Sequence, residues 1–158
     1  MNKVSKDEIK GLENTASDYI VKTLGTGYHE IENDKEGFNE TVSSMLPKDS
    51  VITLDDGESV SSKDYAEKLS DYYTGHEIQS DVKFTTADCL TYIDNYYYVR
   101  GRLDVTPYHG KSEKTNLLPG GIDITKKASY VVEVSLKPSS DSKSTLVTGV
   151  NVLGKIEA

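Results

Sequence analysis

The chain has 158 residues, a formal net charge of −8, 35% hydrophobic residues and no Trp. The length fits one domain with its own core, which we expect to span residues 1–158, and the negative charge argues against general nucleic-acid binding. Cys89 is the only cysteine, which excludes an intrachain disulfide.

Hydropathy and the distribution of charge bear on membrane insertion, on export and on where an anion could bind. No apolar run approaches the roughly 18–20 residues of a membrane span, so we expect no direct membrane insertion by this segment. Met1–Lys10 is polar throughout, so no signal peptide is expected. Residues 1–80 carry 17 acidic and eight basic side chains, whereas residues 81–158 carry nine and ten. Any anion-binding surface is therefore expected in the second half.

The first predicted helix spans Ser5–Leu24. Ser5 and Glu8 have the spacing of a capping box, and apolar side chains recur behind them at helical intervals. Glycines at positions 25 and 27 stop this pattern. Residues 28–37 are rich in acidic side chains, and we predict that they form a connection.

Two more helices are predicted before the first long strand. Apolar side chains at helical spacing mark a short second helix over Phe38–Leu46, which Pro47 ends. A brief extended piece over Val51–Leu54 follows, and residues 55–57 are predicted to turn. The third helix opens with a capping spacing at Ser61 and ends at Gly75.

From residue 77 onward the pattern changes to the alternation of strands. Four long strands are predicted, over Ile78–Phe84, Tyr96–Thr106, Tyr130–Leu136 and Thr145–Ile156. The last of these is apolar on both sides, which favours a central or covered position in the sheet. Three helices followed by a hairpin series of strands predict an α+β fold, with the helices packed on a curved antiparallel sheet of about four strands.

The connections between these strands are less regular. Leu90, Tyr92 and Ile93 continue the extended structure up to a predicted tight turn at Asp94-Asn95. Residues 107–127 are predicted to form a long loop, and residues 139–144 a polar turn.

The strand over Tyr96–Thr106 separates into two faces when it is read with a period of two. Tyr97, Val99, Gly101, Leu103 and Val105 lie on a nearly apolar face, and Tyr96, Tyr98, Arg100 and Arg102 lie on an aromatic and charged one. Tyrosine and arginine are enriched at interaction hot spots, so the second set is our candidate interaction face. The alternative is an ordinary solvated sheet exterior with cross-strand pairs.

The order of these elements resembles the NTF2-like (cystatin-like) cone fold. The residues that carry the resemblance are the helical stripes Ile9–Leu24, Phe38–Leu46 and Tyr65–Tyr73 and the strands Ile78–Phe84, Tyr97–Val105, Tyr130–Leu136 and Leu146–Val152. The resemblance covers most of the chain and is one of element order. It implies a single domain in which the helices close one side of a cone-shaped sheet.

Within that superfamily, the chain resembles most the VirB8-like domains of bacterial conjugation (type IV secretion) machines. Its content of Lys, Asn, Ser and Tyr is similar to that of a Gram-positive example, although Gram-negative members carry an Asn-Pro-x-Gly turn where this chain has Leu118-Pro119-Gly120-Gly121. The resemblance implies a non-catalytic assembly domain outside the cell, anchored by a segment missing from this chain, with a cytoplasmic protein as the alternative. It implies protein partners in a membrane-associated assembly, and a homo-oligomer is a further option.

Another branch of the same superfamily is enzymatic and holds an acid or base inside the cone. The inward faces of the strands here offer Tyr97 and Tyr130 but no carboxylate or imidazole. The alternative function is therefore a small-ligand or enzymatic pocket lined by Tyr65, Tyr97 and Tyr130. A core role, with the hydroxyl group at the rim, is the competing interpretation of these tyrosines.

The remaining reactive side chains show no catalytic or metal-binding spacing. His29, His76 and His109 lie far apart in sequence, each beside a turn or loop. Cys89 has no basic neighbour in sequence and is predicted to be a small apolar residue. The acidic turn that begins at Asp55 lacks the spacing of a calcium loop. We therefore expect no enzyme activity, no metal and no cofactor.

Overall fold

The computed structural model describes residues 5–48, 51–54, 57–90, 96–111, 115, 117–139 and 144–157. Within these ranges the helices are α1 (Lys6–Leu24), α2 (Tyr28–Asn33), α3 (Lys35–Ser44), α4 (Ser62–Gly75) and the short 3₁₀-helix η1 (Pro119–Gly121). The strands are β1 (Val51–Thr53), β2 (Ser59–Ser61), β3 (Gln79–Leu90), β4 (Tyr97–His109), β5 (Ala128–Pro138) and β6 (Thr145–Ile156). None of the described helices is long and apolar enough to span a membrane.

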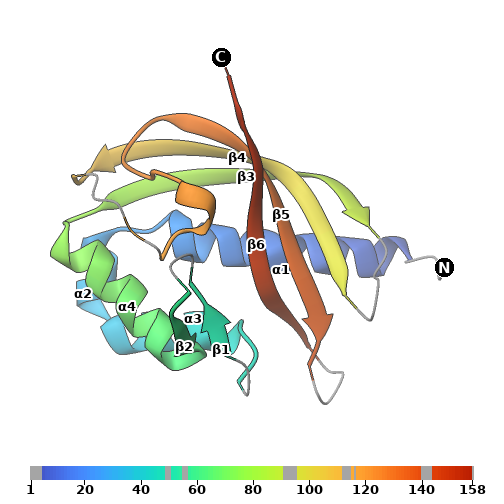
Figure 1. Ribbon diagram of the computed structural model, residues 1–158, viewed down its shortest axis with the longest axis horizontal. Coiled ribbons are helices and arrows are strands. Elements are labelled where there is room, and N and C mark those ends of the chain that lie inside the picture. Colours follow the sequence, from blue (N-terminus) through green and yellow to red (C-terminus); the bar gives the residue numbers. More distant parts are fainter. Residues whose placement is uncertain are drawn as a thin grey trace.

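The strands form two antiparallel sheets. β3, β4, β5 and β6 pair in that order, and β1 pairs with β2 in a separate two-stranded sheet. Figure 1 shows the larger sheet curving over α1, while α2, α3 and α4 lie on the same side of it. The sheet stays open, because β3 and β6 do not pair with each other. The predicted α+β fold, with helices packed on a curved antiparallel sheet, is confirmed.

The caps predicted for the first and third helices are present. The Ser5 hydroxyl accepts a hydrogen bond from the Glu8 N–H at 3.2 Å, and the Ser61 hydroxyl accepts one from the Asp64 N–H at 3.1 Å. Each cap satisfies a backbone donor that the first turn of a helix leaves unpaired. The predicted boundaries of α1 and α4 therefore agree with the structure within one residue at each end.

The acidic stretch 28–37 was predicted as a connection, and this prediction is wrong. It contains α2 and the start of α3, and the Asp34 carboxylate between them accepts a hydrogen bond from the Gly37 N–H at 2.9 Å. The buried side chain of α2 is Ile31 alone. A single apolar residue has no period, so the sequence offered no helical pattern to find. The described residues thus contain four helices before β3 instead of the three predicted.

Two predictions about the strands also need correction. The sequence predicted a loop from residue 107, but β4 continues through Pro107 to His109. Its pairing with β5 ends at Val105, and beyond that residue β4 pairs with β3 alone. A proline fits a strand where its missing N–H faces no partner. β6 lies at the edge of the sheet, so the expectation of a central strand is wrong. The predicted turns at residues 55–56 and at Asp94-Asn95, and the extended residues 91–93, lie outside the described residues.

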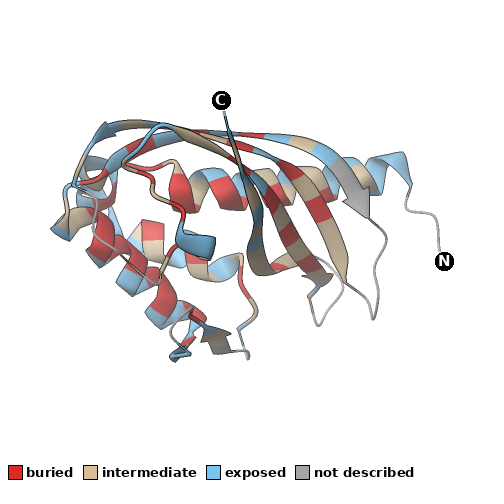
Figure 2. Cartoon of the chain, turned by 45° about the horizontal axis from the view of Figure 1, so that its top comes forward, coloured by how far each residue is buried: buried red, intermediate tan, exposed pale blue. Residues whose placement is uncertain are grey.

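The core lies between α1 and the concave side of the sheet. Its fully buried side chains include Ile20 and Leu24 of α1, Leu69 and Tyr73 of α4, and Leu103 of β4. Figure 2 shows buried segments on the faces of α1, α4 and the strands that turn toward one another. This packing covers most of the concave side and leaves the region beside β1 and β6 less filled.

Candidate functional site

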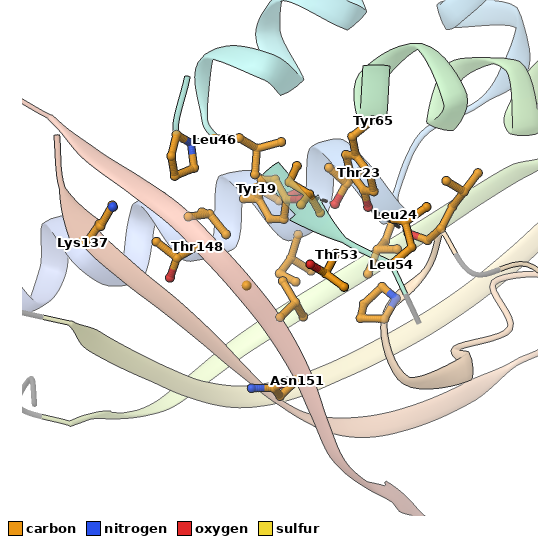
Figure 3. A pocket seen from close by; sticks show the side chains of 18 of the residues that line it. Tyr19, Thr23, Leu24, Leu46, Thr53, Leu54, Tyr65, Lys137, Thr148 and Asn151 are labelled. Carbon is orange, nitrogen blue, oxygen red and sulfur yellow. Dashed lines mark hydrogen bonds between the residues drawn. The ribbon is translucent and has the colours of Figure 1, made fainter. Parts of the chain in front are cut away.

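A cavity of about 500 Å³ opens beside α1, between the two sheets. Its walls come from α1, the chain before β1, β1 itself, α4, the segment before η1, and both partners of the β5–β6 hairpin. Figure 3 shows Tyr19 and Thr23 of α1, Tyr65 of α4, and Thr148 and Asn151 of β6 around this space. A volume of this size lies in the range of about 300–1,000 Å³ typical of ligand sites.

The polar groups of this cavity are mostly uncharged. Hydroxyl groups come from Tyr19, Thr23, Thr53, Tyr65, Tyr96 and Thr148, and an amide comes from Asn151. Among the described residues that line it, Lys137 at the end of β5 is the one with a charged side chain. The cavity therefore suits an occupant that accepts or donates hydrogen bonds and carries a negative group near Lys137.

Two tyrosines of α4 donate hydrogen bonds to backbone carbonyls of other segments. The Tyr65 hydroxyl donates to the Leu117 carbonyl at 2.8 Å and so attaches the segment before η1 to α4. The Tyr73 hydroxyl donates to the Thr23 carbonyl at 2.7 Å. Burial raises the pKa of Tyr19 and of Tyr73 well above the usual value, and the neighbouring Tyr65 adds to both shifts. Both phenols are therefore neutral at physiological pH.

The predicted interaction face carries ordered ion pairs. Arg100 and Glu133 are cross-strand partners, and their Nε and Oε2 atoms lie 2.6 Å apart. The Arg102 Nε donates to Asp104 at 2.8 Å, and the Ser129 hydroxyl donates to the same carboxylate. These two contacts lower the pKa of Asp104, the bond from Ser129 being the larger cause. The Arg100–Glu133 and Asp104–Ser129 contacts match the cross-strand pairing named as the alternative for this face, whereas Arg102 and Asp104 lie on the same strand.

The structure separates the four residues proposed for that face. Tyr98 is half-buried. Tyr98, Arg100 and Arg102 stand two positions apart along β4, so their side chains lie on the same, outer side of the sheet. Tyr96 precedes β4 and lines the cavity instead. The sequence placed it on the outer face because the alternation was extended one residue beyond the point where the strand begins.

The three tyrosines proposed for a pocket lie in different places. Tyr65 lines the large cavity. Tyr130 lines a shallower depression of about 380 Å³ together with Gly120 and Lys155, and Tyr97 packs against the edge of the core. The sequence missed Tyr19, Thr23 and Lys137 as cavity residues. Each belongs to an ordinary helical or strand pattern, so only the packing of distant elements reveals that they share one site.

The three histidines make local contacts. Two of them, His29 and His109, lie beside Tyr28, with ring centroids 4.0 Å and 5.8 Å from that of the tyrosine. His76 contacts the Tyr72 carbonyl through Nδ1 at 3.0 Å. No group of three His, Cys, Asp or Glu side chains is arranged to hold a metal ion in the part of the chain that the structure describes. The side chain of Cys89 lies outside that part.

Comparisons with known proteins agree with this architecture. No protein-family model and no curated protein matches the sequence. A ketosteroid isomerase-like protein from Erwinia carotovora atroseptica is similar over 98% of this chain and all of its own, at 14% identity and a TM-score of 0.56. An NTF2-like protein from Cytophaga hutchinsonii is similar over 96% of this chain and 99% of its own, at 12% identity and a TM-score of 0.52.

A third similar structure is an NTF2-like protein involved in plasmid conjugation. The match covers 92% of this chain at 14% identity and a TM-score of 0.51, and this chain spans 48% of that protein's length. Identities this low establish similarity of fold and do not transfer activity. The helices packed inside an open, curved four-stranded sheet therefore form an NTF2-like fold.

Proposed function

We propose that this protein is a non-catalytic protein-interaction domain of a bacterial conjugative transfer (type IV secretion) apparatus. The observation that carries the proposal is its similarity in fold to the NTF2-like protein involved in plasmid conjugation. Because this chain spans about half of that protein, the role, the partners and the extracellular, anchored location are all part of the proposal.

The chemistry of the cavity supports binding over catalysis. A general acid or base works best with a pKa near the operating pH. Tyr19, which lines the cavity, has a pKa raised well above its usual value and so far from that range, and Lys137 contributes a cation. These groups can fix the position of an occupant through hydrogen bonds and charge, as a recognition site requires.

The outer side of the larger sheet supports the proposal of a protein partner. The described helices lie on the opposite side, so this face is free to meet another surface. Arg100 and Arg102 are already held by Glu133 and Asp104, so little side-chain freedom would be lost when a partner docks. Val131, which lies on the same face, is 36% exposed.

Binding to the components of a conjugation apparatus tests the proposal. Purified protein is used to pull down the other extracellular components, and the Arg100→Ala, Arg102→Ala double variant is compared with it. We expect the variant to bind more weakly. Its melting temperature should fall slightly, because both arginines are largely exposed but Glu133 is 13% exposed and loses its partner.

A matched control removes two exposed ion pairs elsewhere on the molecule, both made by lysines. Lys35 pairs with Asp71 and Lys68 with Glu58, both on the helical side of the molecule. The Lys35→Ala, Lys68→Ala variant changes the net charge equally and is expected to keep full binding. An inert monomer in light scattering that retains none of these components would contradict the proposed function.

The cavity favours a second candidate, a small-ligand-binding protein. Its volume and its hydroxyl groups, including that of Tyr65, are suited to a small molecule with several hydrogen-bonding atoms. Screening a fragment library by NMR tests this role. Specific binding should shift signals of Tyr19, Tyr65 and Lys137, and should weaken in Tyr65→Phe. Shifts confined to the outer side of the sheet would contradict it.

A further inference from the structure

The cavity follows the edge of β6. Five consecutive residues of this strand, Val147–Asn151, line it. Successive side chains of a strand point to opposite faces of the sheet. Consecutive residues border one cavity where it runs along the strand edge and meets backbone groups as well as side chains, and the extra residue Thr148 at the register shift adds to this by re-aiming a side chain. Figure 3 shows the labelled residues Thr148 and Asn151 spaced along this strand.

The outer edge of β6 has little pairing of its own. Among the described residues, β6 is linked to a segment other than β5 by a backbone hydrogen bond, which the Val147 N–H donates to the Met45 carbonyl at 2.8 Å. Register shifts interrupt the pairing with β5 on either side of Gly149–Val152. Between them these four residues pair regularly with β5. The bulges thus limit the edge to a short segment with a defined register.

Other elements border the groove at its ends and along its opposite wall. Met45 contacts one end of β6, and at the other end Gly120 of η1 lies so close to Val152 that an added Cβ would meet it at 2.6 Å. Ile52–Leu54 lines the opposite wall, and β1 is itself an edge strand of the small sheet. The cavity therefore has the form of a short channel beside a strand edge.

We infer that this channel binds an extended segment of a partner protein, which pairs with the edge of β6 as an added strand. At about 3.3 Å per residue, the five residues of β6 that border the channel match a segment of similar length. β6 carries no charge between Thr145 and Gly154, and Lys137 is the charged group of the channel. The segment is therefore largely uncharged and presents one acidic side chain to Lys137.

Charge disfavours a second copy of this chain as the occupant through its own β6. That strand contains Lys155 and no acidic residue, so pairing two copies would bring no carboxylate to Lys137. The net charge of −8 also repels like molecules. This inference rests on the proposed function, since it assigns the partner segment and its site to the proposed interaction domain.

Selection from a phage-displayed library of random nine-residue peptides tests the inference. We expect enriched peptides with alternating β-branched residues and one acidic position. Binding of a synthetic copy should shift the backbone amide signals of Gly149–Val152 in NMR. Two further copies carry N-methylated amides at alternate positions in opposite registers. The copy methylated at the N–H groups that face β6 should lose binding, because it cannot donate those hydrogen bonds.

Two charge reversals on the full chain then locate the site. Lys137→Glu should weaken binding of the selected peptide about tenfold, because attraction is replaced by repulsion. Lys155→Glu changes the net charge equally, but Lys155 lines the separate depression, so this variant should bind normally. Equal loss in both variants, or binding that survives both N-methylation patterns, would overturn the inference.

The other outcomes separate this inference from the proposed function. Peptides that shift only the NMR signals of residues on the outer face of the sheet would overturn the strand-pairing site. They would leave the proposed role as an interaction domain standing. Failure to select any peptide while fragments occupy the channel would overturn the inference in favour of a small-ligand site. A concentration-dependent dimer in sedimentation that protects the amides of β6 would make a second copy the occupant and also overturn it.

Discussion

At the scale of single residues, Tyr73 joins α4 to the end of α1. The last carbonyl groups of a helix have no partner within it, and the buried Thr23 carbonyl receives the Tyr73 hydroxyl instead. The sequence shows Tyr73 as an inward-facing helical residue. It does not show which carbonyl lies within reach of the hydroxyl group, because that depends on how α1 and α4 cross.

Replacing Tyr73 with Phe should lower the free energy of unfolding by about 1–3 kcal/mol, because the Thr23 carbonyl stays buried without a donor. Urea denaturation monitored by circular dichroism measures the change. Tyr108→Phe is the matched control, since Tyr108 is 64% exposed, and should leave the free energy of unfolding nearly unchanged. Equal stability of the two variants would contradict a capping role.

The pKa of Asp104 should depend on Ser129. The hydrogen bond from Ser129 is the largest cause that lowers this pKa, followed by the bond from Arg102. Ser129→Ala should raise the pKa toward the ordinary value. The stability that Asp104 contributes is present above the ordinary pKa and is lost as pH falls through the lowered one. Carbon-13 NMR titration of the carboxyl group measures the shift, and Ser135→Ala on the same strand should have no effect.

At the scale of elements, most of the helices and strands were predictable. The stripes of α1, α3 and α4 and the alternation of β4 and β5 are periodic over several residues, so their types could be identified from sequence. α2 could not, because Ile31 is its one buried residue. Of the two positions expected for β6, central or covered, the central one is wrong, because the order of strands depends on which neighbours pair and not on how apolar a strand is.

Two glycines should respond in opposite ways to alanine. A Cβ at Gly101 in β4 would meet the Thr85 carbonyl oxygen at 2.6 Å and the Phe84 ring at 2.8 Å, so Gly101→Ala should destabilise by about 1–3 kcal/mol. Gly11 lies within α1 with nothing within 4 Å, so Gly11→Ala should stabilise by about 0.5–1 kcal/mol through helix propensity. Chemical denaturation compares both with the parent chain, and changes of the same sign would contradict this packing.

At the scale of the whole molecule, the open sheet decides where a binding site can lie. α1 fills the centre of the concave side, and the cavity remains where the edge strands β1 and β6 face each other without pairing. The same packing buries Tyr19 and Tyr73 so deeply that their ionisation opposes the folded state.

Stability should therefore fall at alkaline pH. Above the ordinary tyrosine pKa of about 10, the unfolded chain releases protons that the buried phenols retain in the native state, so the free energy of unfolding decreases as pH rises. Urea midpoints measured between pH 8 and pH 11 should show this decline. Tyr73→Phe should show a shallower decline, because one of the two phenols is gone, and a slope equal to that of the parent would contradict the explanation.

The sequence by itself determined the α+β class, the caps of α1 and α4, and the two faces of β4, since these follow from local spacing and alternation. Only the tertiary structure decided that Arg100 and Arg102 are held in ion pairs, that Tyr96 belongs to the cavity, and that β6 is an edge strand. These features arise from contacts between segments far apart in the chain. Such contacts depend on the curvature and pairing of the whole sheet, which no local pattern specifies.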